Sequence, residues 1–445
     1  MDFTPHTTED TARMLEHLGL SKISDLFAHL PDGVRPKRPL DLPTSLAEME
    51  VMTHINLLGG LNRSELVTFA GGGIYDHYLP PVVRSLTMRP EFVTSYTPYQ
   101  SELSQGVLQM LFEFQSMIAS LTGLRVANSS LYDGPSSGLE AVNLAVAHKK
   151  RPTVWVSRGV HPHTRQIITT FAHARAIELV EHPLVGGRTV WATDGVPEPA
   201  AIIMSQPNYL GVIEDYDAAR AVATDNDALA IAAVDAMMLG VLRSPGDAGF
   251  DIAFAEGQPF GNPMSFGGPV LGVFAVSEAL MRAIPGRLVG RTIDTAGRTA
   301  YTLTLRTREQ DIRRQKASSN ICTNQSLNAI AAAIYLAWVG PAGLAELGNQ
   351  SLQKAHYLAR RLEDIRGVEI ATPGAQYARE FAILTPADPQ WVVERMAERG
   401  FLAGIPLSND FPEFGGGLLV AVTEKRSIGE LDGYAAALEE VLAVD

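Results

Sequence analysis

The sequence contains very little cysteine, since Cys322 is the only one among 445 residues. A single thiol excludes an internal disulfide framework and a cysteine-rich zinc site. We therefore expect a protein of the reducing cytoplasm. Because no histidine pattern beside Cys322 suggests activation, we expect this residue to be a small buried side chain and not a nucleophile.

Positive charge and long apolar runs are also scarce. Lys and Arg number 36 against 49 Asp and Glu, which gives a net charge of -13 and argues against binding to nucleic acid or to an anionic membrane. No apolar run approaches the roughly 20 residues that span a bilayer. The opening residues, MDFTPHTTED, are acidic and do not resemble a secretory signal.

Nucleotide and metal signatures are missing as well. The sequence has no GxGxxG after a strand, no GxxxxGK[ST] and no HExxH. HPH at 161–163 lacks a third ligand at a recognisable spacing, so we expect no metal site.

What is present is a helical start followed by alternating strands and helices. Residues 1–60 predict a helical arm, 61–106 are mostly loop, and apolar residues at helical spacing predict a helix over 107–121 that ends at Gly123. From about 125 onward, short β-rich runs alternate with helices, which predicts an α/β fold with a mostly parallel sheet. We expect a large domain over 61–330 and a smaller α/β domain over 331–445.

Several polar features then fall in an informative order. The loop YDGPSSG (132–138) runs into a helix predicted over 138–150, His161 ends a strand, Asp235 ends another, and a Gly-rich loop follows at 255–269. A Gly/Ser loop before a helix can hold a phosphate, although it is more often only a cap. The order is that of pyridoxal-phosphate (PLP) enzymes of fold type I, in which an Asp faces the pyridine nitrogen and a lysine holds the cofactor.

The expected lysine is absent. The chain has seven lysines, and none lies between Asp235 and Gly267–Pro269. Only Lys316, in RRQKASSNICTNQ, has polar neighbours typical of a site, but it lies too far along the chain for the usual order. We expect it to be an anion contact or a surface charge.

Five segments identify a family resemblance. They are FAGGGIYDHYLPPVV (69–83), SYTPYQSELSQGVLQMLFEFQSMIASLTGL (95–124), YDG (132–134), EGQPFGNPMSFGGPVLG (256–272) and RRQKASSNICTNQSL (313–327). With them the chain closely resembles glycine dehydrogenase (decarboxylating), the P-protein of the glycine cleavage system, in the alpha-chain (subunit 1) group of its two-subunit form. The loop at 132–138 is richer in Ser and Pro than the family pattern.

The resemblance implies PLP fold type I, with the cofactor on the other subunit. In the beta chain (subunit 2) a lysine stands eleven residues before the last proline of a Gly-rich loop, and here that position is Gln258, counted back from Pro269. An amide cannot form the Schiff base. The family reaction is decarboxylation of glycine on PLP and transfer of the aminomethyl group to the lipoyl arm of H-protein, with release of CO2. The implied assembly is an α2β2 heterotetramer.

Candidate site residues follow from the same interpretation. We expect a contribution to the partner's active site from the polar loop before the long helix, namely from Tyr96, Thr97, Tyr99, Gln100 and Glu102. Contacts to the partner or to the cofactor phosphate are expected from Asn262, Ser265, Gly267 and Gly268. His77 is either a proton donor or acceptor near the site or a structural histidine. His161 and Asp235 are expected to be vestigial.

Two alternatives stay open at this point. The chain could be a self-sufficient PLP decarboxylase that uses Lys316. It could also be a structural scaffold that stabilises the beta chain and docks H-protein.

Overall fold

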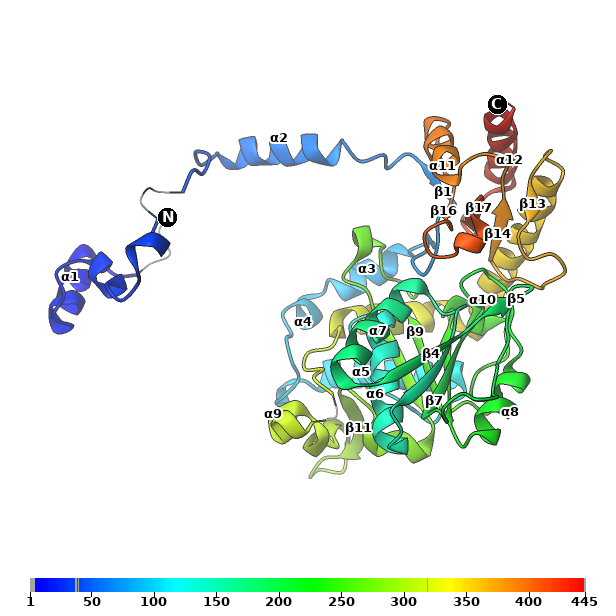
Figure 1. The fold of residues 1–445 in the computed structure, drawn as a ribbon. Helices are drawn as coiled ribbons and strands as arrows, with labels where there is room; N and C mark the ends of the chain where they lie inside the picture. The colour runs from blue at the N-terminus through cyan, green and yellow to red at the C-terminus, as the bar shows by residue number, and fades with distance from the viewer. Residues whose placement is uncertain (1–4, 37, 39, 318, 444–445) are drawn as a thin grey trace. The chain divides into compact units, whose positions relative to one another are not determined.

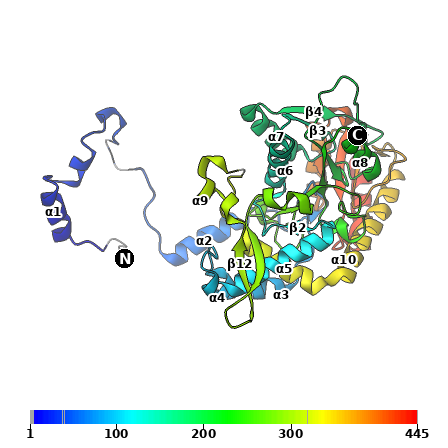
Figure 2. The same ribbon diagram turned by 90° about the horizontal axis from the view of Figure 1, so that it is seen from below.

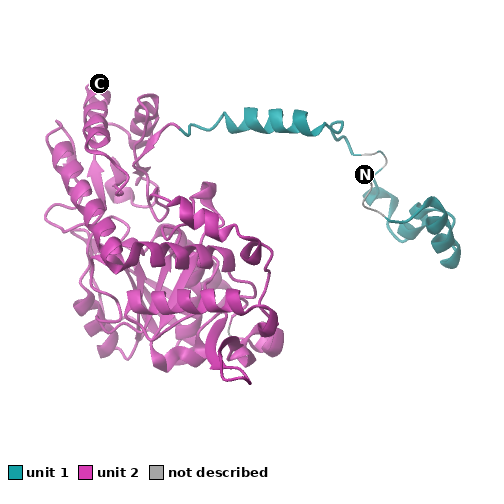
Figure 3. Cartoon of the chain, turned by 180° about the vertical axis from the view of Figure 1, so that it is seen from behind, with its two compact units in different colours: residues 1–64 teal, residues 65–445 magenta. Residues whose placement is uncertain are grey.

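The computed structural model describes residues 5–36, 38, 40–317 and 319–443. The chain divides into two units, Met1–Ser64 and Glu65–Asp445 (Figure 3). The first unit contains α1 (Thr8–His17), the 3-10 turns η1 (Ile23–Phe27) and η2 (Asp32–Val34), and α2 (Glu48–Gly59). Thr7 and Asp10 form a capping box at the start of α1. None of the described residues in these four elements is buried.

A seven-stranded sheet forms the centre of the second unit (Figure 1). Its order is β2 (Val126–Ala127), β10 (Gly272–Val276), β9 (Ile252–Glu256), β8 (Leu229–Val234), β7 (Ala201–Gln206), β3 (Thr153–Ser157) and β4 (Glu178–His182). All neighbouring pairs from β9 to β4 are parallel, and β10 is antiparallel to both of its neighbours. The predicted mostly parallel sheet is therefore confirmed.

Helices cover both faces of this sheet. On one face Val154 and Val156 pack with residues of α6 (Gly134–Lys149) and α7 (Pro162–Arg175). On the other face Trp155 packs in a core with residues of α5 (Gln105–Thr122), α8 (Tyr216–Asp225) and the first half of α10 (Ser326–Glu363). Successive residues of a strand point to opposite faces, so a strand buried on both faces needs an unbroken apolar run like that of β3.

A four-stranded sheet lies at one end of the unit (Figure 1). Its order is β13 (Glu369–Ile370), β14 (Glu380–Leu384), β17 (Gly417–Ala421) and β16 (Ile405–Pro406), all antiparallel. It packs with the second half of α10, with α11 (Pro389–Glu398) and with α12 (Ile428–Leu442). Beside it, β1 (Val67–Thr68) pairs with β15 (Phe401–Leu402). The predicted boundary at 330/331 falls within α10, and the division at that point stays a prediction.

Helix α10 by length and composition alone is long and apolar enough to cross a membrane. It is interrupted at Gly340, whose φ is +65°, and Pro341 follows. Its first half belongs to the large core and its second half to the core of the small sheet. In this fold it is a core helix that joins the two sheets.

The segment 61–106 is mostly loop, as expected, but it also holds short helices that the sequence did not predict. It contains α3 (Pro81–Thr87), α4 (Pro90–Val93) and the turn η3 (Ser101–Leu103). Both short helices begin with a proline, whose fixed φ suits the first helical position.

Two antiparallel hairpins were also not foreseen. They are β5 (Leu184–Val185) with β6 (Arg188–Thr189), and β11 (Leu288–Ile293) with β12 (Thr299–Thr304). The second projects from the body beside α9 (Gln310–Arg313) (Figure 2).

Candidate functional site

Three side chains expected at a cofactor site lie at the carboxyl-terminal edge of the seven-stranded sheet. His161 follows β3, Asp235 follows β8 and Gln258 follows β9. Parallel strands end at the same edge, which is where ligands bind in such sheets. The segment 71–78 crosses this edge. Gly71 permits the crossing, since a Cβ there would lie 2.4 Å from the Glu380 carboxylate.

Asp235 forms an ion pair with Arg379, which directly precedes β14 of the four-stranded sheet. Arg379 donates from Nε to Asp235 Oδ2 (2.6 Å), and Asp235 Oδ1 accepts the N–H of Met237 (3.0 Å). The Arg379 side chain is 1% exposed, and its guanidinium lies 3.5 Å from the centroid of the Tyr75 ring. Both oxygens of the expected pyridine-facing carboxylate therefore have partners within the chain.

His77 is buried behind this pair. Its Nε2 accepts a hydrogen bond from Arg379 Nη1, so the ring proton lies on Nδ1, which donates to Glu424 (2.5 Å). Burial lowers the pKa of His77, in keeping with a neutral imidazole between a cation and a carboxylate. This geometry makes His77 a structural link.

Glu380 completes the cluster. Its Oε1 accepts the N–H of Gly72 (2.7 Å), and its Oε2 accepts the Tyr75 hydroxyl (2.6 Å). Burial raises the pKa of Glu380 from 4.5 to about 7 and raises that of Tyr75 well above its usual value. Asp235, Arg379, Tyr75, His77, Glu380 and Glu424 together form what we call the Asp235–Arg379 cluster.

Gln258 stands where the lysine would be, and its amide is fully used. The side-chain Oε1 accepts the N–H of Tyr75 (3.1 Å). The Nε2 group donates to the carbonyls of Tyr75 (3.3 Å) and Asn262 (2.8 Å). Gln258 is 2% exposed. A lysine in this position could not accept the Tyr75 N–H, so the surroundings match an amide.

The start of α6 carries a carboxylate of the same chain. Glu256 Oε2 accepts the N–H of Gly134, the first residue of α6 (3.0 Å), and Oε1 accepts those of Gln258 (2.8 Å) and Leu271 (2.9 Å). Burial raises the pKa of Glu256 to about 7. Three N–H groups converge on this carboxylate, and one of them belongs to the N-terminus of a helix, which commonly binds an anion. Here an internal carboxylate occupies that position.

The predicted phosphate loop is itself part of α6. The helix begins at Gly134 and not at 138, because Asp133 caps it by accepting the N–H of Ser136 (2.6 Å). Residues 134–138 therefore form the first turn and do not form an open loop.

His161 is half-buried and contacts groups of the chain itself. Its Nε2 lies 2.6 Å from the Gly72 carbonyl oxygen, and its Nδ1 accepts the N–H of His163 (3.0 Å). Its ring meets that of Tyr209 edge-on at 5.0 Å. Burial lowers the pKa of His161 to about 4, so the ring is neutral at neutral pH.

These residues do not fit PLP. The anchor position holds an amide whose hydrogen bonds are used. The expected nitrogen partner, Asp235, holds Arg379, the α6 N-terminus holds Glu256, and the stacking histidine faces Gly72 and Tyr209. Every recognition point that the sequence suggested is occupied by a group of the chain itself.

The loop of Tyr96 to Glu102 lies elsewhere on the second unit and is partly presented to solvent. Tyr96 is 76% exposed and Tyr99 is 49% exposed, and Gln100 and Glu102 are exposed as well. The Tyr96 hydroxyl lies 3.2 Å from Thr323 Oγ1. Thr97 Oγ1 is buried without a hydrogen-bond partner among the described residues.

The loop is pinned at its end by Gln105. Its Nε2 donates to the carbonyls of Ser101 (2.7 Å) and Tyr301 (2.8 Å), and its Oε1 accepts the N–H of Tyr301 (2.9 Å). The loop is therefore fixed to β12 while several of its side chains stay accessible.

The second set of candidates divides between interior and surface. Asn262 is buried and donates to the carbonyls of Phe260 (3.2 Å) and Asn328 (3.3 Å). Ser265 and Gly267 are exposed in the turn η5 (Ser265–Gly267), and Gly268 follows half-buried with a φ of +151°. Phe266, at the tip, is 95% exposed.

The remaining candidates lie at the surface. Lys316 is exposed in the turn η8 (Arg314–Lys316). Cys322 is exposed, which corrects the expectation of a buried thiol: it lies in the irregular segment before α10, where its N–H donates to the Tyr132 hydroxyl (3.4 Å). Within the described ranges, no group of three or more His, Cys, Asp or Glu is placed to hold a metal ion.

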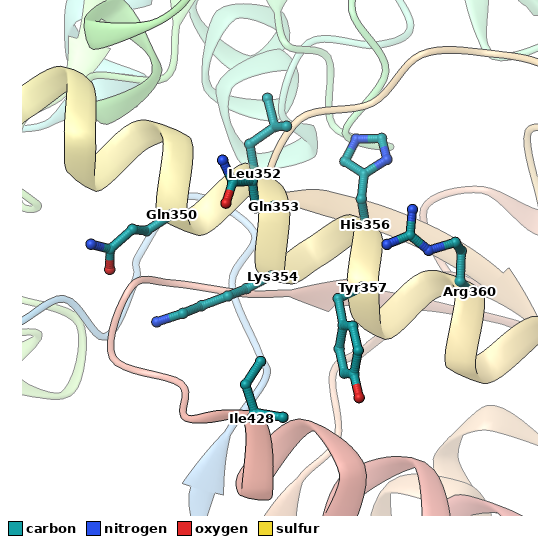
Figure 4. Close-up of a pocket in the computed structure, with 8 residues that line it drawn as sticks. All are labelled: Gln350, Leu352, Gln353, Lys354, His356, Tyr357, Arg360 and Ile428. Atoms are coloured by element: carbon teal, nitrogen blue, oxygen red, sulfur yellow. The ribbon is translucent and has the colours of Figure 1, made fainter.

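A groove of about 560 Å³ lies along the second half of α10 beside the start of α12 (Figure 4). Lys354, His356 and Arg360 give its lining a basic character, and the Lys354 amine bonds to the carbonyl of Glu424 (2.5 Å). None of the candidate site residues lines it.

The sequence did not predict most of the Asp235–Arg379 cluster. Tyr75, Arg379, Glu380 and Glu424 lie far from Asp235 along the chain. One signal in the sequence could have indicated a buried ion pair there: the charged residues RE (379–380) stand at the start of an otherwise apolar strand. Such residues are seldom buried unless they are paired.

The chain is similar to known proteins over nearly its whole length. The family model "Glycine cleavage system P-protein" matches residues 1–436. A probable glycine dehydrogenase (decarboxylating) subunit 1 from Moorella thermoacetica is 45% identical over 446 residues, covering 100% of both chains. The protein of the same name from Chloroherpeton thalassium is 42% identical, covering 99% of this chain and 100% of its own.

Solved structures agree. The crystal structure of an inhibitor-bound glycine decarboxylase (P-protein) of the glycine cleavage system superposes with a TM-score of 0.89 at 43% identity, covering 99% of this chain and 100% of that one. A sphingosine-1-phosphate lyase from Burkholderia pseudomallei has a TM-score of 0.66 at 15% identity, covering 93% and 94%. The second match bears on the fold alone, and together they confirm fold type I of the PLP-dependent enzymes.

Proposed function

This chain belongs to the glycine cleavage system P-protein family, and we propose that within it the chain is the cofactor-free subunit of a two-chain glycine decarboxylase. Its curated relatives are named subunit 1 of glycine dehydrogenase (decarboxylating), an oxidoreductase, and that name implies a second subunit. The P-protein function is thereby favoured over a self-sufficient decarboxylase based on Lys316 and over a pure scaffold.

The observation that carries the proposal is the internally filled cofactor position. Gln258 has no nucleophilic amine, and its amide already pairs with Tyr75 and Asn262. Asp235 is neutralised by Arg379, and Glu256 takes the anion position at α6. PLP is therefore held by subunit 2, where it supplies the electron sink for decarboxylation of glycine.

This chain contributes side chains to the PLP site of subunit 2. The loop of Tyr96, Thr97, Tyr99, Gln100 and Glu102 offers hydroxyl, amide and carboxyl groups on a support pinned by Gln105. Such a support holds side chains in place for a substrate bound by another chain. Ser265, Gly267 and Gly268 contact the partner or the cofactor phosphate, while the buried Asn262 holds that loop to α10.

The wider assembly follows the family pattern. The complex is an α2β2 heterotetramer of the cytoplasm, and it passes the aminomethyl group from glycine to the lipoyl arm of H-protein with release of CO2. The first unit, with its exposed apolar side chains such as Leu18, Phe27 and Leu57, provides surface for subunit contacts.

Glycine–bicarbonate exchange tests the proposal. The chain alone with PLP should show no exchange, and the mixture with subunit 2 and PLP should exchange label. Alanine at Tyr96 or Gln100 should reduce turnover of the mixture while the complex still assembles by size exclusion. Arg298→Ala, at the exposed turn of the β11–β12 hairpin, serves as the control. Exchange by the chain alone would contradict the proposal, and full turnover by the loop variants would assign the chain a scaffold role.

A further inference from the structure

Two arginines lie beside the loop of Tyr96 to Glu102, and a third, Arg308, shares with them an electrostatic interaction with Glu309. Arg287 directly precedes β11, while Arg306 and Arg308 belong to the turn η7 (Arg306–Arg308) after β12. The guanidinium carbons of Arg287 and Arg306 lie 5.2 and 5.6 Å from the centroid of the Tyr99 ring. The β11–β12 hairpin thus brings Arg287 and Arg306, from its two ends, to this loop.

Most donors of this cluster have no acceptor among the residues that the structure describes. Arg287 is 2% exposed and donates from Nη2 to the Tyr99 hydroxyl (3.2 Å), but its Nε and Nη1 are buried and unpartnered. Arg308 donates from Nη1 to the Ile284 carbonyl, and its Nε and Nη2 are likewise unpartnered. Arg306 Nε and the Thr97 hydroxyl are also buried without a hydrogen-bond partner among the described residues.

Buried guanidinium donors without acceptors are strongly unfavourable, so an acceptor from outside this chain would stabilise the cluster. Burial also lowers the pKa of Arg308, which is the effect of removing a cation from water without full compensation.

The charges of the cluster indicate the kind of acceptor. Two acids lie beside the three arginines: Asp311 accepts from Arg306 Nη2 (3.0 Å), and Glu309 has one buried oxygen without a partner in the described part of the chain. One positive charge is left in excess. A carboxylate carries one negative charge, and its two oxygens match the planar fork of a guanidinium.

We propose that Arg287, Arg306 and Arg308, together with the Thr97 hydroxyl, form a binding site for one carboxylate group in the assembled complex. This proposal rests on the assignment of the neighbouring loop to the partner's active site. It adds that a carboxylate group is bound beside that loop. Two carboxylates are available at such a place: that of the substrate glycine and that of an acidic side chain of subunit 2.

The test compares complexes that contain wild-type chain, Arg308→Met, Arg287→Lys or the control Arg298→Met. Arg298 is exposed and pairs with Asp294 at the hairpin turn, so its variant removes the same charge away from the cluster. The KM for glycine in the exchange reaction and the dissociation constant of the two subunits are measured for each. Sodium acetate, the free carboxylate probe, is compared with sodium chloride at equal ionic strength.

If the site binds glycine, Arg308→Met raises the KM at least tenfold, leaves the subunit dissociation constant unchanged and abolishes competitive inhibition by acetate. If it binds the partner's carboxylate, the dissociation constant rises at least tenfold, and KM at saturating subunit 2 is unchanged. Arg287→Lys retains a charge and shows a smaller effect in either case, and Arg298→Met shows none.

Changes below twofold in both quantities for Arg308→Met, in a chain that keeps its thermal stability, would overturn the carboxylate site. That outcome is distinct from failure of the proposed function, which would appear as loss of exchange in the wild-type complex or as full turnover in the Tyr96 and Gln100 variants.

Discussion

Replacing Arg379 by methionine is expected to destabilise the chain far more than the loss of an ordinary ion pair. The side chain is 1% exposed, and its partner carboxylate on Asp235 is 11% exposed. Removing the cation leaves Asp235 with backbone N–H groups as its described partners and takes away the donor to His77 Nε2. The cation over the Tyr75 ring is lost as well.

The expected magnitude follows from the burial of the pair. Removing one partner of a buried ion pair costs about 3–5 kcal/mol, because the remaining charge is left uncompensated. Replacing both partners by neutral groups is often close to neutral. The double variant Arg379→Met/Asp235→Asn should therefore recover much of the loss, since Asn can still accept the N–H of Met237.

Urea unfolding followed by circular dichroism measures these changes, with the midpoint and slope compared across variants. The matched control is Arg361→Met, which breaks the exposed pair of Arg361 and Asp432 (3.2 Å, side chains 47% and 42% exposed) and should change stability by less than about 1 kcal/mol. A loss for Arg379→Met no larger than that of the control, or a double variant as unstable as the single one, would refute a buried, charge-compensated cluster.

Three further predictions concern Gln258, Glu380 and Gln105. Gln258→Lys incubated with PLP should show no aldimine absorbance, because Arg379 still holds Asp235 and Glu256 still holds the α6 N-terminus; appearance of the band would contradict the filled site. Burial raises the pKa of Glu380 from 4.5 to about 7, so its contribution to stability is present below pH 4.5 and is lost as the pH rises through 7. The free energy of unfolding of Glu380→Gln, measured in urea, should therefore rise relative to that of wild type by up to about 3 kcal/mol between pH 4.5 and 8. A difference in this free energy that does not change with pH would argue against the raised pKa. Gln105→Ala should lower exchange turnover several-fold in the complex while PLP stays bound to subunit 2, and unchanged turnover would show that pinning of the loop is irrelevant.

Local patterns in the sequence were enough to predict the mostly parallel sheet and several of the helices around it. Apolar runs such as TVWVS (153–157) gave strands, the spacing of apolar residues gave α5 and its end at Gly123, and the order of strands and helices gave the mostly parallel sheet. The short helices α3 and α4 were missed because each has only one or two turns, too few for periodicity to show.

The site was predicted only in outline. The position of Gln258 followed from the resemblance, but its hydrogen bonds to Tyr75 depend on a segment 183 residues away. The pair of Asp235 and Arg379 joins residues 144 apart, and such contacts have no local signal. The arginine cluster was missed for the same reason, since Arg287 and Arg306 come to the same Tyr99 ring only because the β11–β12 hairpin folds back.

The most direct test of the central claim is to locate the cofactor. The chain alone and the chain with subunit 2 are incubated with PLP, reduced with borohydride, digested and searched for pyridoxyl-lysine by mass spectrometry. We expect no label on this chain in either sample, with label on subunit 2 and glycine–bicarbonate exchange in the mixture alone. A pyridoxyl group on Lys316, or on any other lysine of this chain at a stoichiometry near one, would contradict it.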